Sequence, residues 1–467
     1  MTPVLSRARG DGRPAAPVRI VHLGLGNFFR AHEAWYTDRA PDADRWGIAA
    51  FTGRSTAPAR VLAAQDCLYT VLTRAADGDT ARVVGSLSRA HSGTDHAAWL
   101  ASLADPAVAI LSLTVTEAAY LRSPDGGLAA DLPEVRHDVA TLRQDLRAPV
   151  QTVPGRLMAG LAARRSAAGP GSPGVRAGLA VLPGDNLPGN GGVAARVVTE
   201  LASRVDPGLA GWIEQHVSFV GTVVDRITPA TTDADLEPAA ALTGRTDRAP
   251  VVTEPYTEWQ LCGDFPAGHP DWAAAGARWV DDIAPFEDRK LWLLNGGHSL
   301  LAYAGGALGH GTVAEAVSDA RCRRWLGQWW DEAVRHLALP DGDKDRYRAA
   351  LVERWRNPRI RHRLAQIAAD GSQKLPVRVL PAVRAERRAG RLPAGGLRVL
   401  AGWIVHLRGR GPEVTDVAAD RFRALAAGPP ERAVPAVLDA LDPALARDRP
   451  VVDTTARLCR DLEDAAR

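Results

Sequence analysis

A short segment in the second half of the chain gathers polar side chains that suit proton transfer. Within residues 284–305 (APFEDRKLWLLNGGHSLLAYAG), Lys290 is preceded by Glu287 and followed by Asn295 and His298. On an α-helix that advances about 100° per residue, Glu287, His298 and Asn295 lie about 60°, 80° and 140° from Lys290. The four polar groups are therefore predicted to share one helix face.

These residue types fit the oxidation of a secondary alcohol. That reaction needs a base for the hydroxyl proton and donors that stabilise the developing alkoxide. A desolvated lysine has a lowered pKa and can act as the base. We therefore predict Lys290 as the base and Asn295 as an oxyanion donor. His298 is predicted to position the substrate, with Glu287 as a proton-relay partner. The alternative is a solvent-exposed helix face with no catalytic role, in which the histidine makes ordinary hydrogen bonds within the protein.

Two consecutive glycines, Gly296 and Gly297, lie inside the same predicted helix. Each destabilises a helix interior by roughly 1 kcal/mol relative to alanine. Residues that disfavour the local helix, placed beside a polar face, are typical of a functional site. We expect the glycines to make room for a substrate or a nicotinamide ring against the backbone.

A strand, a glycine turn and a helix follow one another near the start of the chain. Residues 18–24 (VRIVHLG) read as a buried strand, Gly24 and Gly26 form a Gly-x-Gly turn, and residues 28–36 read as a helix. This order opens a dinucleotide-binding fold, in which the turn and the helix N-terminus meet the phosphates. Phe29 occupies the position of the usual third glycine, so we expect the helix to lie further from the strand or to shift. An ordinary strand-to-helix turn is the alternative.

The end of the second predicted strand, residues 46–52, lacks the carboxylate that normally binds the adenosine ribose. Arg54 and Arg60 follow instead and could tolerate the extra phosphate of NADP, or they are solvated loop arginines. NAD is the predicted cofactor, and NADP stays open. The predicted cofactor-binding residues are Gly24, Leu25, Gly26, Asn27, Phe28, Arg54 and Thr116.

Two further polar groups follow predicted strands. Asp185 and Asn186 come after the strand at residues 178–182, and Asp225 and Arg226 end the strand at residues 217–224. Ligands bind at the carboxyl ends of parallel strands, so Asn186 could be a second alkoxide donor. The alternative for GDNLPGNGG is an ordinary turn, because its Asp, Asn, Pro and Gly residues strongly favour turns. The alternative for Asp225 and Arg226 is an ion pair.

The predicted elements divide the chain into two halves. Buried strands, including residues 107–115, alternate with helical segments before about residue 280, as in a parallel sheet covered on both faces. Residues 165–178 read as a flexible loop. Amphipathic helices dominate afterwards. We predict an α/β protein with a Rossmann-type dinucleotide-binding domain at residues 18–280 and a mostly α-helical substrate and catalytic domain at residues 281–467.

Composition excludes several other classes of function. A net charge of +3 over 467 residues, with dispersed arginines, gives no basic stripe for nucleic acid. The four cysteines form no Cys-x-x-Cys pair, and neither a signal-peptide core nor a run of about 20 apolar residues occurs. We expect a cytoplasmic monomer or small homo-oligomer that binds neither nucleic acid nor membrane.

Several segments, in chain order, resemble the polyol-specific long-chain dehydrogenases, the mannitol dehydrogenase family. The resemblance runs from about residue 18 to beyond residue 400 through GLGNFFRAH, SLTVTEAAY, GDNLPGNG, VVDRITP, EPYTEWQ, DFPAGHPDW and KLWLLNGGHSLLAY. The spacing of lysine, asparagine and histidine in the last segment is highly specific. The resemblance implies a Rossmann-type domain, a helical C-terminal domain and metal-independent hydride transfer to or from NAD(P).

The resemblance also implies residue roles. The base is Lys290, the oxyanion donors are Asn186 and Asn295, the substrate-orienting residues are His298 and Asp225, and the proton-channel residue is Glu287. Gly184 departs from the family because a cysteine often precedes the Asp-Asn pair. The missing acid after the second strand is the other departure, and it bears on cofactor choice.

The substrate is a polyol or a hexuronate. Residues 357–378 (NPRIRHRLAQIAADGSQKLPVR) look closer to the fructuronate reductase (mannonate dehydrogenase) branch than to some mannitol 2-dehydrogenases. Lys374 and Arg378 could bind a substrate carboxylate or could be surface charges. D-Mannonate/D-fructuronate and D-mannitol/D-fructose both stay open. The alternative function is a nucleotide-sensing protein without catalysis, which the intact lysine, asparagine and histidine disfavour.

Overall fold

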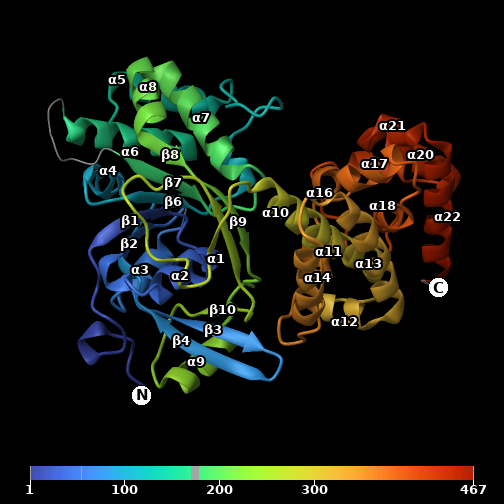
Figure 1. The fold of residues 1–467 in the computed structure, drawn as a ribbon, viewed down its shortest axis with the longest axis horizontal. Helices are drawn as coiled ribbons and strands as arrows, with labels where there is room; N and C mark the ends of the chain where they lie inside the picture. Colours follow the sequence, from blue (N-terminus) through green and yellow to red (C-terminus); the bar gives the residue numbers. More distant parts are fainter. Residues whose placement is uncertain (1, 54, 170–177, 466–467) are drawn as a thin grey trace. The chain divides into compact units, whose positions relative to one another are not determined.

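The computed structural model describes residues 2–53, 55–169 and 178–465. These residues form two compact units, Met1–Ala284 (unit 1) and Pro285–Arg467 (unit 2). Figure 1 shows sheets and helices in unit 1, and helices in unit 2. The predicted fold class, a Rossmann-type parallel sheet followed by a mostly helical region, is confirmed. Among the described residues, no helix combines the length and the apolar character needed to cross a bilayer.

Unit 1 is built on a six-stranded sheet whose neighbouring strands are all parallel, in the order β5-β2-β1-β6-β7-β8. The order reverses between β1 and β6, and ligands of such sheets bind at this switch point. Apolar residues fill the strands because both faces are covered. The strands are β1 (Val18–Leu23), β2 (Gly47–Phe51), β5 (Leu87–His91), β6 (Ile110–Leu113), β7 (Leu179–Pro183) and β8 (Val217–Phe219).

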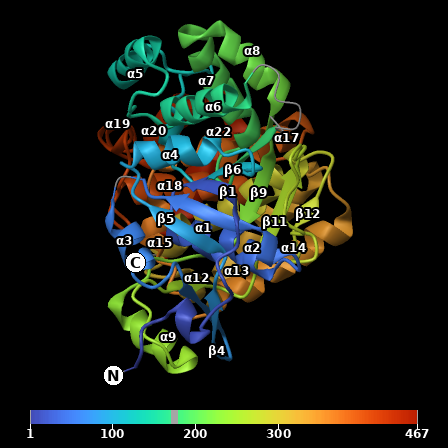
Figure 2. The same ribbon diagram turned by 90° about the vertical axis from the view of Figure 1, so that its left-hand side faces the viewer.

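Helices cover both faces of this sheet. Figure 2 shows α4 to α8 along one face and α1 to α3 along the other. Alternate residues of β1 serve the two layers: Val21 and Leu23 belong to one core, and Ile20 belongs to the other. The helices are α1 (Asn27–Ala31), α2 (Glu33–Arg39), α3 (Ala57–Ala63), α4 (His96–Ala104), α5 (Pro133–Gln144), α6 (Val153–Ala168), α7 (Asn190–Val205) and α8 (Pro207–His216).

The helix expected over residues 28–36 is wrong as one continuous element. It is two short helices, α1 and α2, which break at His32 (φ −119°, ψ −94°). The Phe29 ring is fully buried and stacks on the His22 ring of β1, with ring centroids 3.4 Å apart. The aromatic side chain at the third-glycine position is thus accommodated by a ring stack beside β1.

Two small sheets complete the regular structure of unit 1. One contains β10 (Val251–Thr253) and the hairpin of β3 (Tyr69–Ala75) and β4 (Gly78–Val84), with α9 (Leu236–Thr243) nearby. The other contains β9 (Gly221–Asp225), β11 (Glu258–Cys262) and β12 (Arg278–Trp279). The single strand expected over residues 217–224 is therefore wrong, because β8 and β9 belong to different sheets.

Regular structure in the described part of unit 2 is helical. Helix α18 lies at its centre, since its residues from Leu397 to Leu407 are buried except Arg398. The helices are α10 (Ala284–Arg289), α11 (Gly297–Leu300), α12 (Val313–Ser318), α13 (Ala320–Ala333), α14 (Asp341–Trp355), α15 (Leu364–Ala368), α16 (Gly371–Arg378), α17 (Leu380–Arg388), α18 (Ala394–Leu407), α19 (Ala419–Leu425), α20 (Pro430–Leu441), α21 (Pro443–Ala446) and α22 (Arg449–Ala465). Two π-helical turns, Lys290–Gly296 and Leu301–Gly305, flank α11.

Candidate active site

The glycine turn of unit 1 lies at the switch point and is tied to two neighbouring strands. The backbone N–H groups of Gly24 and Leu25 both donate to the carbonyl of Phe51, at 2.9 and 3.0 Å. Gly24 has a φ of +112°, and a Cβ there would lie 2.1 Å from the carbonyl oxygen of Thr114. Position 24 therefore requires glycine on both conformational and steric grounds.

The residues after this turn differ in what surrounds them. Gly26 is exposed, and the nearest protein atom to an added Cβ would be 3.6 Å away, so the backbone there is open to a ligand. The Asn27 amide is held within the protein, donating to Thr231 Oγ1 at 3.2 Å and accepting from Arg30 at 2.7 Å. Leu25 is buried and Phe28 is half-buried.

Two predicted cofactor residues lie outside the glycine turn. Thr116 is exposed and follows β6 at the same carboxyl edge of the sheet as the glycine turn. Arg54 lies outside the described residues, so the structure gives it no position.

A buried carboxylate joins the ends of β6 and β7. Asp185 accepts a hydrogen bond from the N–H of Val115 at 2.8 Å and a short one from the Tyr120 hydroxyl. Burial raises the pKa of Asp185 to about 7, and burial together with Asp185 raises the pKa of Tyr120. By accepting both hydrogen bonds, Asp185 anchors the turn after β7 to the residues that follow β6.

Asn190 connects the same turn to β9. Its side-chain amide donates to the carbonyl of Thr222 at 3.0 Å, and its carbonyl oxygen accepts from the Thr222 N–H at 3.0 Å. Asn186, between these two anchors, is exposed. Asp225, at the end of β9, is only 4% exposed. The flanking residues thus form the turn expected from the sequence, while the Asn186 side chain stays accessible.

The predicted catalytic segment of unit 2 has a geometry that the helical wheel did not anticipate. Residues from Lys290 to Gly296 form a π-helical turn, in which hydrogen bonds join residues five apart. The assumed advance of 100° per residue is therefore wrong here. A π-helical turn contains more residues than an α-helical one, so Asn295 lies closer to the direction of Lys290 than the about 140° expected of an α-helix. Lys290 and Glu287 are both half-buried.

Asn295 and His298 are buried, at 7% and 6% exposure. Asn295 Oδ1 and His298 Nε2 have no hydrogen-bond partner among the described residues. The His298 ring packs on Trp355, with centroids 4.7 Å apart, and against the edge of His362 at 5.0 Å. Burial, with smaller effects of His362, Arg354 and Arg378, lowers the pKa of His298. Its ring is thus neutral near pH 7.

The explanation expected for the paired glycines is wrong. A Cβ at Gly296 would lie 2.8 Å from the Trp329 ring, and one at Gly297 would lie 2.7 Å from the Trp355 ring. The indole N–H groups of Trp329 and Trp330 donate to the carbonyls of Trp292 and Leu293, each at 2.9 Å. Tryptophan rings, not a ligand, therefore fill the space beside the glycines.

The two predicted carboxylate-binding residues lie on α16. The Lys374 amine is 3.4 Å from the carbonyl of Ile367, to which it donates. The Arg378 side chain contributes to the lowered pKa of His298, and its backbone carbonyl would lie 3.0 Å from a Cβ at Gly296. The structure therefore brings Arg378 close to the π-helical segment, whereas the Lys374 amine contacts the end of α15.

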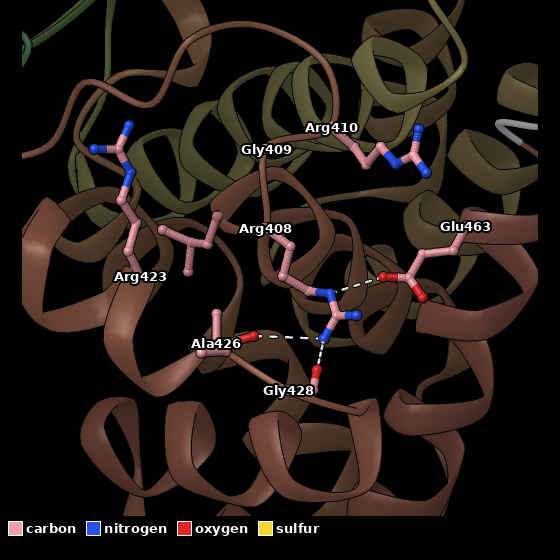
Figure 3. Close-up of a pocket in the computed structure, with 9 residues that line it drawn as sticks. Arg408, Gly409, Arg410, Arg423, Ala426, Gly428 and Glu463 are labelled. Carbon is pink, nitrogen blue, oxygen red and sulfur yellow. Dashed lines mark hydrogen bonds and ion pairs between the residues drawn. The ribbon is translucent and has the colours of Figure 1, made fainter.

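Two other features of unit 2 contain none of the predicted site residues. His310, Asp319 and Cys322 are the one group of potential metal ligands found among the described residues, but Arg321 already pairs with Asp319 at 2.8 Å. A pocket of about 650 Å³ lies beside the ends of α18 and α19 and is shown in Figure 3. There Arg408 pairs with Glu463 at 2.7 Å.

Comparison with known proteins identifies the family. The model of the mannitol dehydrogenase Rossmann domain matches residues 18–274, and that of the mannitol dehydrogenase C-terminal domain matches residues 282–443. This chain belongs to the mannitol dehydrogenase family. Membership of the mannitol dehydrogenase family makes it an oxidoreductase, and the resemblance seen in the sequence is confirmed.

Three relatives of known name illustrate the range of the mannitol dehydrogenase family. D-Mannonate oxidoreductase of Escherichia coli is 38% identical over 84% of this chain and 80% of its own length. Mannitol 2-dehydrogenase of Pyricularia oryzae is 35% identical over 78% and 73%. The structure of Pseudomonas fluorescens mannitol 2-dehydrogenase with NAD and D-mannitol matches with a TM-score of 0.81, 31% identity, and coverage of 96% and 92%.

Sequence reasoning missed several residues that contact or position the predicted site residues within each unit of this mannitol dehydrogenase family member. His362 and Trp355 contact His298, and Tyr120 and Asn190 fix the turn that carries Asn186. His362 lies in the segment already singled out for Lys374 and Arg378, so the histidine in this segment was a usable signal. Asn190 is the last residue of GDNLPGN, where the sequence alone indicated only a residue that favours a turn.

The packing of the tryptophans predicts the effect of Gly296→Ala. The new methyl group would press on the Trp329 ring and on the carbonyl of Arg378, so we expect overpacking to destabilise the protein by about 1–3 kcal/mol. Gly327→Ala is the control, because position 327 lies inside α13 and has no atom within 4 Å of an added Cβ. The control should be about 0.5–1 kcal/mol more stable than wild type. Thermal unfolding of the three proteins measures both effects, and equal melting temperatures would contradict the packing.

The raised pKa of Asp185 predicts a pH-dependent difference between wild type and Asp185→Asn. Because the folded-state pKa of about 7 exceeds the unfolded value near 4, this residue's contribution to stability is full below pH 4 and is lost as pH rises through 7. From pH 5 to pH 8 the wild type should lose roughly 2–3 kcal/mol relative to the variant, whose neutral amide does not titrate. Melting temperatures at the two pH values test this. A difference that does not change with pH would refute it.

Proposed function

We propose that this chain is an NAD(P)-dependent dehydrogenase that interconverts a secondary alcohol and a ketone on a hexitol or a hexonate. The substrate pairs considered are D-mannonate/D-fructuronate and D-mannitol/D-fructose. Family membership supports the reaction class, and the P. fluorescens relative, which binds NAD and D-mannitol, supports the cofactor and substrate classes.

The switch point of unit 1 fits a dinucleotide. The exposed backbone at Gly26 would allow close approach of a pyrophosphate, which a larger side chain would obstruct. Thr116, exposed after β6, is proposed to line the same site. A bound nicotinamide supplies the hydride acceptor or donor. NAD and NADP both remain in the proposal, because the discriminating segment after β2 contains Arg54.

The catalytic roles follow from the chemistry of each side chain. Lys290 takes the hydroxyl proton as the carbinol hydrogen leaves as hydride, and Asn295 donates to the developing alkoxide. Glu287 accepts the proton from Lys290 and passes it towards water. The same proposal gives Asn186 the second donor position, and His298 with Asp225 the task of orienting the substrate. Reduction of the ketone uses the same groups in reverse.

One observation carries this proposal within unit 2. Asn295 Oδ1 and His298 Nε2 are buried without hydrogen-bond partners, and both residues lie within eight positions of Lys290. An unsatisfied buried polar group destabilises a protein by about 1–3 kcal/mol, so two of them in one helix support a role in binding a polar ligand. π-Helical turns also occur frequently at functional sites.

Turnover of a substrate panel tests the reaction, and Lys290→Ala tests the base. Purified protein is mixed with each reduced nicotinamide and with fructuronate or fructose, and the loss of nicotinamide absorbance is followed. We expect kcat to fall by roughly 10²–10⁴-fold in Lys290→Ala, since that is the usual contribution of a general base. Binding of the reduced nicotinamide should stay within about threefold of wild type. A small primary amine added to the buffer should restore part of the lost activity.

Lys344→Ala serves as the matched control. Lys344 pairs with Asp341 at 2.7 Å on α14, and its removal should leave kcat unchanged. Near-normal turnover in Lys290→Ala would remove lysine as the base. Tight nucleotide binding without turnover of any polyol or hexuronate by the wild type would instead favour a nucleotide-sensing protein.

A further inference from the structure

A second histidine completes a ring cluster around His298. The His362 ring meets the His298 ring edge to face, with centroids 5.0 Å apart, and the Trp355 ring also packs on His298, with centroids 4.7 Å apart. The backbone holds His362 in place: its N–H donates to Ile360 at 2.8 Å, and its carbonyl accepts from Val313 at 3.0 Å. These hydrogen bonds hold the backbone at His362, and the ring itself contacts His298.

Polar atoms of this cluster have no partners among the described residues. They are His298 Nε2, His362 Nδ1 and Trp355 Nε1. The indole nitrogen can only donate, and each neutral imidazole can place its proton on either nitrogen. His298 is more than nine-tenths buried, so water satisfies these atoms poorly. Each of these nitrogens can carry a hydrogen-bond donor that no described residue accepts.

The electrostatic surroundings of the cluster favour an anion. Arg354 lowers the pKa of both imidazoles, and Arg378 further lowers that of His298. Burial is the larger cause in each case and brings the pKa of His362 to about 4, so both rings are neutral near pH 7. A guanidinium that disfavours a proton on these rings also favours a negative charge beside them.

We propose that His362 is a specificity residue that donates a hydrogen bond from Nδ1 to the carboxylate of a hexuronate or hexonate, so that this chain acts on sugar acids in preference to neutral polyols. This inference rests on the proposed dehydrogenase function and adds the substrate class. A carboxylate gains more than a hydroxymethyl group from such donors, because hydrogen bonds to charged groups are the stronger ones. Binding involves no bond breaking, and His362 takes no part in proton or hydride transfer.

Replacement of His362 tests the assignment. His362→Leu keeps the approximate bulk and removes the donor, whereas His362→Asn keeps an amide near the position of Nδ1. Reduction of fructuronate and of fructose is followed with both reduced nicotinamides. In His362→Leu we expect KM for fructuronate to rise about 10–100-fold, the range for one hydrogen bond to a charged group. Its kcat, and KM for fructose, should stay within about threefold. His362→Asn should recover most of the fructuronate affinity.

Two controls separate this role from a structural one. His336→Leu removes a histidine of the same unit that pairs with Glu386 at 2.6 Å, and it should leave the ratio of the two KM values unchanged. The melting temperature of every variant is measured first. If His362→Leu does not fold, competitive inhibition of fructose reduction by glucuronate is compared between wild type, His362→Asn and His362→Gln, whose amide lies near Nε2 and not near Nδ1. The inhibition constant should rise in His362→Gln and stay near wild type in His362→Asn, and an unchanged constant in His362→Gln would overturn the role of His362.

The outcomes distinguish the two proposals. Equal increases of both KM values, an unchanged KM for fructuronate, or a wild type that reduces fructose but not fructuronate would each overturn the role of His362 and leave the dehydrogenase function standing. A wild type that turns over neither substrate, nor any other polyol or hexuronate, would overturn the proposed function itself.

Discussion

The π-helical turn at Lys290–Gly296 is the constraint on which the candidate site of unit 2 depends. Because a π-helical turn contains more residues than an α-helical one, Asn295 lies closer to the direction of Lys290 than an α-helix would place it. The indole N–H groups of Trp329 and Trp330 support this turn by donating to its carbonyls. The two glycines allow those rings to come close. Polar groups, backbone and aromatic packing therefore form one mutually dependent arrangement.

In unit 1, the strand order and anchored turns position the predicted ligand-binding residues. The strand order reverses between β1 and β6. At such a point the residues at the carboxyl ends of the strands can bind a ligand. Gly24 allows the first turn to touch the end of β6, and Asp185 and Asn190 connect the ends of β6 and β7 to the start of β9. Asn186 is thereby held on a short, anchored turn. Its accessibility follows from the burial of the residues on both sides.

The sequence predicted the features that depend on local pattern. Parallel strands read as short apolar runs, and the glycine turn, the polar turn after β7 and the spacing of Lys290, Asn295 and His298 were all visible in the chain. What escaped prediction depends on contacts between distant residues. A π-helical turn has no composition of its own, the role of Gly296 depends on a ring more than thirty residues away, and Phe29 fits only because His22 lies beneath it. Periodicity also cannot show that residues 217–225 contribute to two sheets.

The tryptophan hydrogen bonds have a consequence for how this domain can vary in evolution. A phenylalanine at position 329 or 330 would fill much of the same space, yet it would remove the donor that now reaches a buried carbonyl. An unmade buried hydrogen bond is destabilising by about 1–3 kcal/mol, a sizeable part of the net stability of most domains. Replacement of one aromatic residue by another is usually tolerated in an apolar core. At positions 329 and 330, replacement of tryptophan by phenylalanine is therefore expected to destabilise the protein. The buried carbonyls of Trp292 and Leu293, which need these two donors, therefore restrict which residues α13 can carry at positions 329 and 330.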